Sequence, residues 1–331
     1  MGNFANTILN WYAQNGRQLP WRETHDPYAV WLSEIILQQT RIQQGWAYWE
    51  RFMQRWPNVE MLADATEDEV LRCWQGLGYY SRARNLHKAA QQIKALGHFP
   101  DTLESIRALK GVGDYTAAAI GSIAFGLDAA AVDGNVYRVL ARHFAIDTPI
   151  DTTLGKKTFA ALAESLLPKG QAGTFNQGMM DFGATVCTPQ SPRCGECPLS
   201  GSCEALSTAT IDQLPAKKKR LTPKQRHLIY IYLRHEGQTA LHRRGEGDIW
   251  QGLWEPLLVE DGPLPTLDGQ VSLRRQGVRH VLTHQVLTAD FYVANLNSRP
   301  QLPEGYLWTD EQKLDNYALP RLVELLFERY L

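Results

Sequence analysis

The sequence predicts a multidomain protein in which an all-α region, residues 1–205, precedes an α/β domain, residues 227–331. Three observations support this fold class. Apolar residues recur at spacings of three and four through the first region, which is typical of amphipathic helices. After Cys203 the chain changes to short β-rich runs. With 331 residues, the chain is also longer than one ordinary domain.

The helical region begins with Phe4, Ile8, Trp11 and Tyr12, which share one helix face. Seven of the ten tryptophans lie between Trp11 and Trp74, and we expect most of them in the core. The apolar spacing predicts further helices, with glycines and prolines between them, at 27–55, 66–75, 81–96, 103–110, 114–126, 134–146 and 155–167.

Residues 206–226 read as a polar linker that carries the basic run Lys217–Arg220. This run is either a solvated connector or a contact for a phosphate backbone. The domain after it has predicted strands at Leu228–Leu233 and Leu287–Ala294, and a helix from Pro320 to Tyr330. The sequence holds no internal repeats.

Composition excludes some classes of protein. The 44% of hydrophobic residues and 21% of charged residues exclude a disordered chain. The chain contains no run of 18 apolar residues, which a membrane span would need. Its first residues also lack the pattern of a signal peptide, so we expect a cytoplasmic protein. The net charge of −1 provides no global basic field, so any DNA binding must use a local patch or backbone groups.

Four of the five cysteines fall within 17 residues, with the spacing C-x6-C-x2-C-x5-C, at Cys187, Cys194, Cys197 and Cys203. Disulfides explain this poorly in a chain without secretory signals. A structural zinc ion and a [4Fe–4S] cluster are the two candidates, with chance crowding as the bland alternative. Zinc sites more often use two separated C-x2-C pairs, which favours the cluster. We expect Cys73 to be a buried apolar residue.

Gly111-Val112-Gly113 lies between two predicted helices, in a stretch that permits a tight turn before the second helix. The unpaired amides of that helix start carry partial positive charge and can bind a phosphate. If backbone amides supply the attraction to phosphate, DNA binding is compatible with a net charge near zero. The alternative is an ordinary helix connection.

Two carboxylates stand in unusual settings. Glu34 is flanked by apolar residues on a helix, where burial would raise its pKa and keep a proton for donation. Asp133 follows an apolar run and precedes a helix, where it is either a simple N-cap or also a group that faces a cleft. Together they could divide into an acid and an anion, as in the cleavage of glycosidic bonds.

Taken together, these features resemble the helix–hairpin–helix DNA glycosylases, and within them the MutY family of adenine DNA glycosylases. The resemblance covers residues 1–205 in the family's order. The matching stretches are Leu19-Pro20-Trp21-Arg22, Trp31-Leu32-Ser33-Glu34 through Gln38-Gln39-Thr40, Gly76-Leu77-Gly78-Tyr79-Tyr80-Ser81-Arg82, Gly111-Val112-Gly113, Val132-Asp133-Gly134-Asn135-Val136, Phe175-Asn176-Gln177 and the four cysteines.

The resemblance implies a base-excision-repair glycosylase that removes adenine mispaired with 8-oxoguanine or guanine from double-stranded DNA. It implies a [4Fe–4S] cluster on the four cysteines, a monomer, and a location on the nucleoid in the cytoplasm. It also implies three parts: a six-helix module at about 23–125, an iron–sulfur module of 1–22 plus 126–205, and a Nudix-like domain at 227–331.

The resemblance also assigns roles to residues. Glu34 would protonate adenine and Asp133 would stabilise the sugar cation, with Asn135 and Tyr115 positioning them. Gly111, Val112 and Gly113 would contact the DNA backbone, and the cluster would fix a loop that carries Arg193. Residues of the substrate site would be Trp21, Arg22, Leu37, Gln39, Thr40, Tyr79, Gln177, Thr283 and His284. The bland alternatives are a core aromatic for Tyr79 and a surface ion pair for Arg22.

One position separates this chain from related enzymes. In bifunctional lyases such as endonuclease III, the residue two after the second hairpin glycine is a lysine that forms a Schiff base, and here it is Tyr115. A monofunctional glycosylase is therefore expected. The alternatives are a related glycosylase for thymine mismatches or oxidised pyrimidines, and a non-catalytic iron–sulfur DNA-binding protein.

The C-terminal domain resembles the Nudix-like domain that reads 8-oxoguanine on the opposite strand, through Arg243-Arg244 and the stretch Trp250–Pro256. No R-E-x-x-E-E run follows Trp254, which favours recognition over pyrophosphate hydrolysis. The family usually has Phe-Ser-His where this chain has Leu282-Thr283-His284. Because of this departure, the family's contact with 8-oxoguanine is assigned less securely to Thr283. A histidine such as His284 is, by itself, more typical of a structural role.

Overall fold

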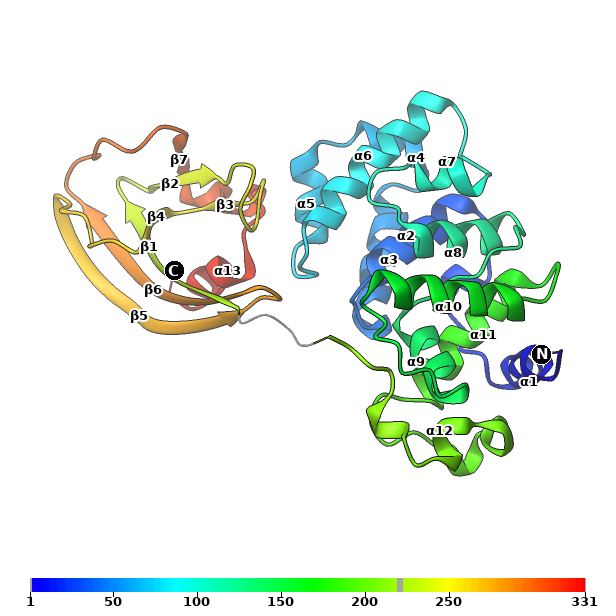
Figure 1. The fold of residues 1–331 in the computed structure, drawn as a ribbon. Helices are drawn as coiled ribbons and strands as arrows, with labels where there is room; N and C mark the ends of the chain where they lie inside the picture. The colour runs from blue at the N-terminus through cyan, green and yellow to red at the C-terminus, as the bar shows by residue number, and fades with distance from the viewer. Residues whose placement is uncertain (1, 219–222, 331) are drawn as a thin grey trace. The chain divides into compact units, whose positions relative to one another are not determined.

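The computed structural model describes residues 2–218 and 223–330, and it divides the chain into two compact units. The first unit comprises residues 1–63 and 88–219, and the second comprises residues 64–87 and 220–331. An all-α region is followed by an α/β domain, as predicted (Figure 1). Among the described residues, no helix is long and apolar enough to cross a membrane.

Helices of the first unit pack around buried apolar faces. One core joins α1, α9, α10 and α11 through Ile8, Leu140, Phe159 and Phe182. The bounds are α1 Gly2–Asn15, α2 Pro27–Leu37, α3 Ile42–Arg55, α4 Val59–Asp64, α6 Ser81–Leu96, α7 Leu103–Arg107, α8 Asp114–Ala124, α9 Gly134–His143, α10 Thr153–Leu166, α11 Ala172–Thr185 and α12 Glu204–Ser207. Helix α5, Glu67–Trp74, and the first turns of α6 belong to the second unit.

The single helix predicted over 27–55 is wrong, because the chain forms α2 and α3 with a turn at residues 38–41 between them. Apolar spacing continues through the turn, so the break leaves no sign in the pattern. At Gln39 the backbone has φ of 57°, a left-handed conformation that no helix contains. The other predicted helices match α5 to α10 to within a few residues at their ends.

The C-terminal part of the second unit is a four-stranded sheet of order β4-β1-β6-β5, together with a three-stranded sheet of order β3-β2-β7. Strands β1 and β6 are parallel, and their neighbours are antiparallel. The bounds are β1 Lys224–Arg234, β2 Gln238–Arg243, β3 Trp254–Glu255, β4 Leu257–Glu260, β5 Gly269–Val281, β6 Gln285–Leu296, β7 Tyr306–Asp310 and α13 Arg321–Tyr330. Strand β1 begins inside the stretch that was predicted as linker.

Strand β1 is buried on both faces. Its even-numbered residues, such as Tyr230, pack with Leu322 and Val323 of α13, while its odd-numbered residues, such as Ile231, pack with Ala240 of β2. The helix and the second sheet therefore cover opposite faces of the first sheet. This explains why Leu228–Leu233 is continuously apolar rather than alternating.

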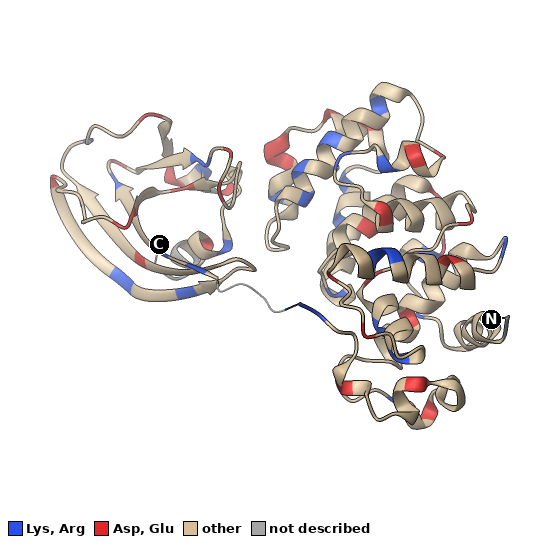
Figure 2. Ribbon diagram, in the orientation of Figure 1, with Lys and Arg blue, Asp and Glu red and all other residues tan. Residues whose placement is uncertain are grey.

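Basic and acidic positions are mixed over most of the elements, as Figure 2 shows, whereas strand β5 carries arginines and no acidic residue. This agrees with the net charge of −1. An anionic polymer would therefore be recognised by particular groups rather than by the overall charge.

Candidate active site

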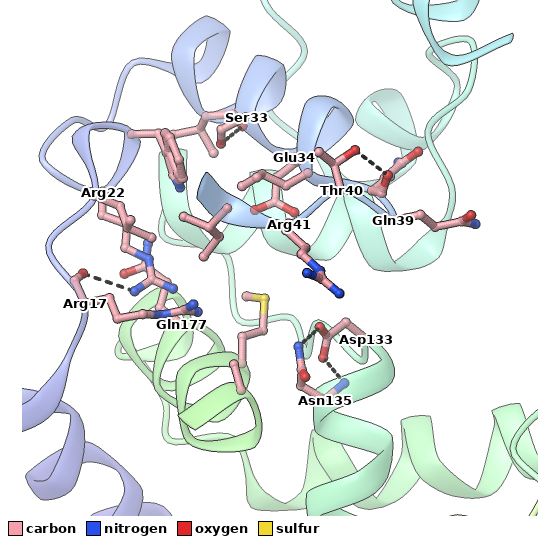
Figure 3. A pocket seen from close by; sticks show the side chains of 18 of the residues that line it. Arg17, Arg22, Ser33, Glu34, Gln39, Thr40, Arg41, Asp133, Asn135 and Gln177 are labelled. Atoms are coloured by element: carbon pink, nitrogen blue, oxygen red, sulfur yellow. Dashed lines mark hydrogen bonds between the residues drawn. The ribbon is translucent and has the colours of Figure 1, made fainter. Parts of the chain in front are cut away.

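The first unit contains a pocket of about 940 Å³. Its lining comes from distant parts of the chain: residues 17–43, the helix α8, the start of α9 and the middle of α11. Glu34 lies on one side of the pocket, Asp133 and Asn135 lie on the other, and Arg22 and Gln177 lie at one end (Figure 3). The size suits one flat heterocycle with its sugar rather than a duplex.

Glu34 enters the pocket from α2, whose start is capped by the Asp26 side chain. The flanking Ser33 and Ile35 are buried, and the Tyr115 hydroxyl donates a hydrogen bond of 2.7 Å to Glu34 Oε2. Burial raises the pKa of the Glu34 carboxyl, while the bond from Tyr115 lowers it in part. A carboxyl in this setting holds its proton more readily than an exposed glutamate does.

Tyr115 is positioned by the first turn of α8, directly behind the hairpin glycines. Its hydroxyl also lies 3.4 Å from Met180 Sδ. Burial, followed by the nearby charges of Glu34 and Asp133, raises the pKa of Tyr115 well above its ordinary value. The phenol therefore remains a neutral donor and is no nucleophile at neutral pH.

Asp133 is the N-cap of α9, as one of the two sequence interpretations expected. Its Oδ1 accepts from the amides of Asn135 at 2.9 Å and Val136 at 2.8 Å, and its Oδ2 accepts from Asn135 Nδ2 at 2.7 Å. Burial raises the pKa of Asp133, and these donors together with the charge of Arg138 oppose the rise. Because Asp133 also lines the pocket, the cap and the cleft-facing group are the same carboxylate.

The segment before Asp133 is held by Asn176, which is buried on α11. The Asn176 amide donates to the carbonyl of Ala129 at 2.8 Å and to Ser122 Oγ at 2.9 Å, and its Oδ1 accepts from the amide of Ala131 at 3.0 Å. All the polar groups of this buried side chain are thus hydrogen-bonded, and they hold the backbone segment that leads into α9. The next residue, Gln177, faces the pocket.

The predicted residues of the catalytic and base-binding sets in the first unit all line the pocket, at Trp21, Arg22, Glu34, Leu37, Gln39, Thr40, Tyr115, Asp133, Asn135 and Gln177. Leu37, Gln39 and Thr40 reach it because the chain turns at residues 38–41. Trp21 is buried and lies edge-on to Trp46 and Trp49, with ring centroids 5.8 and 5.7 Å away.

Sequence reasoning missed Arg17 and Asp181. Asp181 is fully buried, and its carboxylate binds Arg17 together with Arg22, whose Nη1 and Nη2 lie 2.6 and 2.7 Å from the carboxylate oxygens. Burial would raise the pKa of Asp181, but hydrogen bonds from Arg22 and Arg17 lower it. The spacing could have identified Asp181, because it follows Gln177 by four residues and therefore lies on the same helix face.

The hairpin between α7 and α8 lies outside the lining of the pocket. Gly111 has φ of 79°, which favours glycine, whereas Gly113 is an extended N-cap with φ of −101°. A Cβ on Gly113 would meet nothing within 4 Å. The fold therefore favours glycine at Gly111, and the open space beside Gly113 is suited to a close approach by another molecule at the start of α8.

The four clustered cysteines are free thiols that lie near one another. Burial, together with the neighbouring thiols of Cys187, Cys203 and Cys194, raises the pKa of Cys197 to about 11. Four thiolates at this site therefore require a bound cationic group. Within residues 2–218 and 223–330, no three histidine, cysteine or carboxylate side chains are placed to hold a single metal ion. Four cysteine thiols are soft donors that suit a metal centre such as zinc or an iron–sulfur group.

Two arginines of α9 bind this loop, and one of them also contacts the pocket residue Asn135. Arg138 donates to Asn135 Oδ1 at 2.8 Å and to the carbonyl of Cys187 at 2.7 Å. Arg142 donates to the carbonyls of Thr188 at 2.7 Å and of Leu214 at 3.1 Å. Sequence reasoning did not single out either residue, although Arg138 follows Asn135 by one helical turn.

In the second unit, Tyr79 is half exposed in a left-handed conformation, with φ of 46°. Its hydroxyl lies 2.8 Å from Thr283 Oγ1, so two residues from the predicted substrate set are brought together. His284 is exposed, and its carbonyl accepts from the Lys224 amide at 3.0 Å. The bland interpretation of Tyr79 as a core aromatic is wrong.

The same unit also holds a paired cluster, which comprises Arg226, Arg244, Asp248, Glu255 and Glu260. Arg226 binds Asp248 at 2.7 Å and Glu260 at 2.6 Å, each through two hydrogen bonds. Arg244 binds Glu255 at 2.7 Å and Asp248 at 2.5 Å. Arginine partners thus occupy these carboxylates, and the cluster has the character of a structural ion-pair network.

Three family models match the chain. Residues 32–166 match the HhH-GPD superfamily of base excision DNA repair proteins, and residues 187–203 match the iron–sulfur binding domain of endonuclease III. Residues 229–329 match the NUDIX domain. The second match spans all four clustered cysteines, which indicates an iron–sulfur site.

Curated relatives share most of the length. An adenine DNA glycosylase of Buchnera aphidicola is 39% identical over 76% of this chain and 73% of its own. The adenine DNA glycosylases of Rattus norvegicus and Homo sapiens are 45% and 33% identical, each over 99% of this chain and 78% and 74% of their own lengths.

A solved thermostable thymine-DNA glycosylase is 32% identical, with a TM-score of 0.58, over 62% of this chain and 96% of its own. An endonuclease III bound to DNA shares the fold, with a TM-score of 0.54 at 22% identity. The thymine-DNA glycosylase thus matches little beyond the helical region, whereas the relatives from rat and human also match the C-terminal domain.

Proposed function

This chain belongs to the family of adenine DNA glycosylases, and we propose that it hydrolyses the N-glycosidic bond of adenine opposite 8-oxoguanine or guanine in duplex DNA. The observation that carries the proposal is the pair of dissimilar carboxyls, Glu34 and Asp133, facing one pocket of nucleoside size. A target base inside a duplex is inaccessible, so the nucleotide must rotate out of the stack and into this pocket.

Glu34 provides the proton. Because burial raises the pKa of Glu34, a larger fraction is protonated at neutral pH than for an exposed glutamate. Transfer of this proton to N7 of adenine turns the base into a better leaving group. The bond between C1′ and N9 then breaks, and its electron pair leaves with the base.

Asp133 stabilises the cation that remains on the sugar. Its three hydrogen-bond donors hold the carboxylate in place without neutralising its charge. A water molecule adds its oxygen to C1′ and gives up a proton to a carboxylate. Tyr115 stands where a lyase carries lysine and holds its proton, so the proposal includes no cleavage of the strand.

Cys187, Cys194, Cys197 and Cys203 would hold a [4Fe–4S] cluster. Because all four cysteines would serve as ligands, the cluster would supply a structural cross-link rather than a reacting group. Arg138 and Arg142 join this loop to α9, whose first residue follows Asp133. The loop therefore supports the helix on which the Asp133 cap depends.

For the opposite strand, Tyr79 and Gln39 would insert beside the mispaired purine, since each is exposed at a left-handed turn. The hydroxyls of Tyr79 and Thr283 would present the polar contact to 8-oxoguanine. Thr283→Val should lower the preference for 8-oxoguanine over guanine opposite adenine, and an unchanged preference would argue against this assignment.

The first experiment incubates excess protein with end-labelled duplex that contains adenine opposite 8-oxoguanine, and compares strand scission with and without hot alkali. Scission that requires alkali supports release of adenine without lyase activity. Asp133→Asn should retain DNA binding and lose nearly all base release. Scission of a thymine mismatch instead, or none from protein that holds its cluster, would contradict the proposal.

A further inference from the structure

One end of the pocket is organised by a carboxylate that cannot reach solvent. Asp181 has no exposed area, and it accepts hydrogen bonds from Arg17 and from both terminal nitrogens of Arg22. The side chain of Arg22 is itself only 11% exposed. Arg22 is therefore held in one orientation, and its charge is fixed at this end of the pocket.

Helix α1 brings a phenol to the same place. A Cβ on Gly178 would lie 3.2 Å from Tyr12 Cβ, so the glycine permits α1 to approach α11 closely. Tyr12 can then reach Gln177, and its hydroxyl lies 2.9 Å from Gln177 Oε1. The Arg22 guanidinium lies over the same ring, 5.7 Å from its centroid.

The direction of the Tyr12 hydrogen bond follows from this arrangement. A guanidinium has donors and no acceptor, so the cation of Arg22 favours a phenol whose oxygen lone pairs face it and whose proton points away. That proton points toward Gln177, which must then offer its carbonyl oxygen. The amide nitrogen of Gln177 consequently remains on the side of the pocket.

We propose that Tyr12 is a positioning residue that orients the Gln177 amide, so that Gln177 offers its NH₂ group as a donor to the flipped base. The inference rests on the proposed function, because it names the polar group that reads the base in the same pocket. Adenine carries acceptor nitrogens in its ring and a donor in its amino group. The Gln177 donor therefore contacts a ring nitrogen and not the amino group.

The test pairs protein variants with altered bases. Rates of base release in single turnover are measured for adenine, 1-deazaadenine and 3-deazaadenine, each opposite 8-oxoguanine. In the unmodified protein, the analogue that has CH in place of the contacted nitrogen should be released about tenfold more slowly than the other analogue. We call this ratio the penalty. In Tyr12→Phe, this penalty should fall to about threefold or less, because the amide can rotate.

General damage cancels in this comparison, because each analogue's intrinsic reactivity is the same in both proteins. Tyr137→Phe is the matched control, since it removes a phenol whose ring packs on Phe159 away from the pocket lining. It should keep the full penalty. If Tyr12→Phe does not fold, Gln177→Glu serves instead, because a carboxylate has no donor and should abolish the penalty.

Equal penalties in the unmodified protein and in Tyr12→Phe, at both ring positions, would overturn this inference alone. The same holds if Gln177→Glu keeps the penalty. An unmodified protein that holds its cluster and releases no adenine would overturn the proposed function and this inference together.

Discussion

Two groups of charged side chains in this molecule use the same residue types in opposite ways. In the paired cluster of the second unit, each carboxylate binds an arginine at 2.7 Å or less. In the pocket of the first unit, Glu34 binds only the Tyr115 hydroxyl among the hydrogen bonds described, and Asp133 binds amides. Arg22, which could pair with Glu34, is directed to Asp181 instead.

The difference lies in which groups bind each carboxylate. Arg226 lowers the pKa of Asp248 to about 2, so that carboxylate is ionised at neutral pH. Burial raises the pKa values of Glu34 and Asp133, and it also raises the pKa of Glu255 in spite of the bound Arg244. A paired carboxylate stabilises architecture, whereas one left with a raised pKa beside a cavity can exchange protons with a substrate.

The largest effect is expected for Glu34→Gln, which keeps the shape and an acceptor for Tyr115 but removes the transferable proton. Base release in single turnover should fall by about a thousandfold or more, while the free energy of unfolding changes by less than about 1 kcal/mol. Urea unfolding of the same preparation provides the second measurement. A large loss of stability would show that Glu34 has a structural role, like the carboxylates of the paired cluster.

Arg244→Met should show the reverse pattern. It leaves the buried Glu255 without its arginine, whereas Asp248 keeps Arg226, and the loss at Glu255 costs about 3–5 kcal/mol in unfolding free energy. Adding Glu255→Gln should recover part of this loss, because the unpaired charge is then removed. Thermal unfolding of both variants measures the effect, and a loss below about 1 kcal/mol would show that the network contributes little.

Tyr115→Phe sharpens the comparison through pH. The Tyr115 hydrogen bond favours the ionised form of Glu34 and lowers its pKa relative to burial alone. Removing the hydroxyl should raise that pKa, so the active protonated acid persists to higher pH.

We therefore expect the alkaline limb of the rate profile to move to higher pH, with a plateau rate reduced by about tenfold. Single-turnover rates between pH 5 and 10, set beside those of Phe144→Leu as a control outside the pocket lining, would measure the shift. A shift to lower pH would contradict the assignment of Glu34 as the acid.

The smallest effect is expected at the hairpin, where backbone groups replace charged side chains. Gly113→Ala meets no atom within 4 Å inside the protein, so stability should change by less than about 1 kcal/mol. Duplex binding should weaken by about five- to tenfold if a phosphate sits against the start of α8. Gly111→Ala, at φ of 79°, should instead lower stability, and equal binding by Gly113→Ala would remove the hairpin from the DNA interface.

Much of this protein could be read from local patterns in its sequence. Some features depend only on residues that are close together in the chain, so the sequence alone reveals them. They are the helical spacing, the N-cap at Asp133, the cysteine spacing and the change to β-rich runs after Cys203. The two-part fold class followed from them. The residues that carry the resemblance to glycosylases lie in such local motifs as well.

The tertiary structure alone decided how those motifs form one pocket. The turn at residues 38–41 interrupts an apolar pattern that continues through it, because packing against other segments outweighs local periodicity there. Arg17 and Asp181 are 164 residues apart, and Tyr12 and Gln177 are 165 apart. A buried charge takes whichever partner the fold brings to it, so Asp181 is paired with two arginines while burial raises the pKa of Glu34.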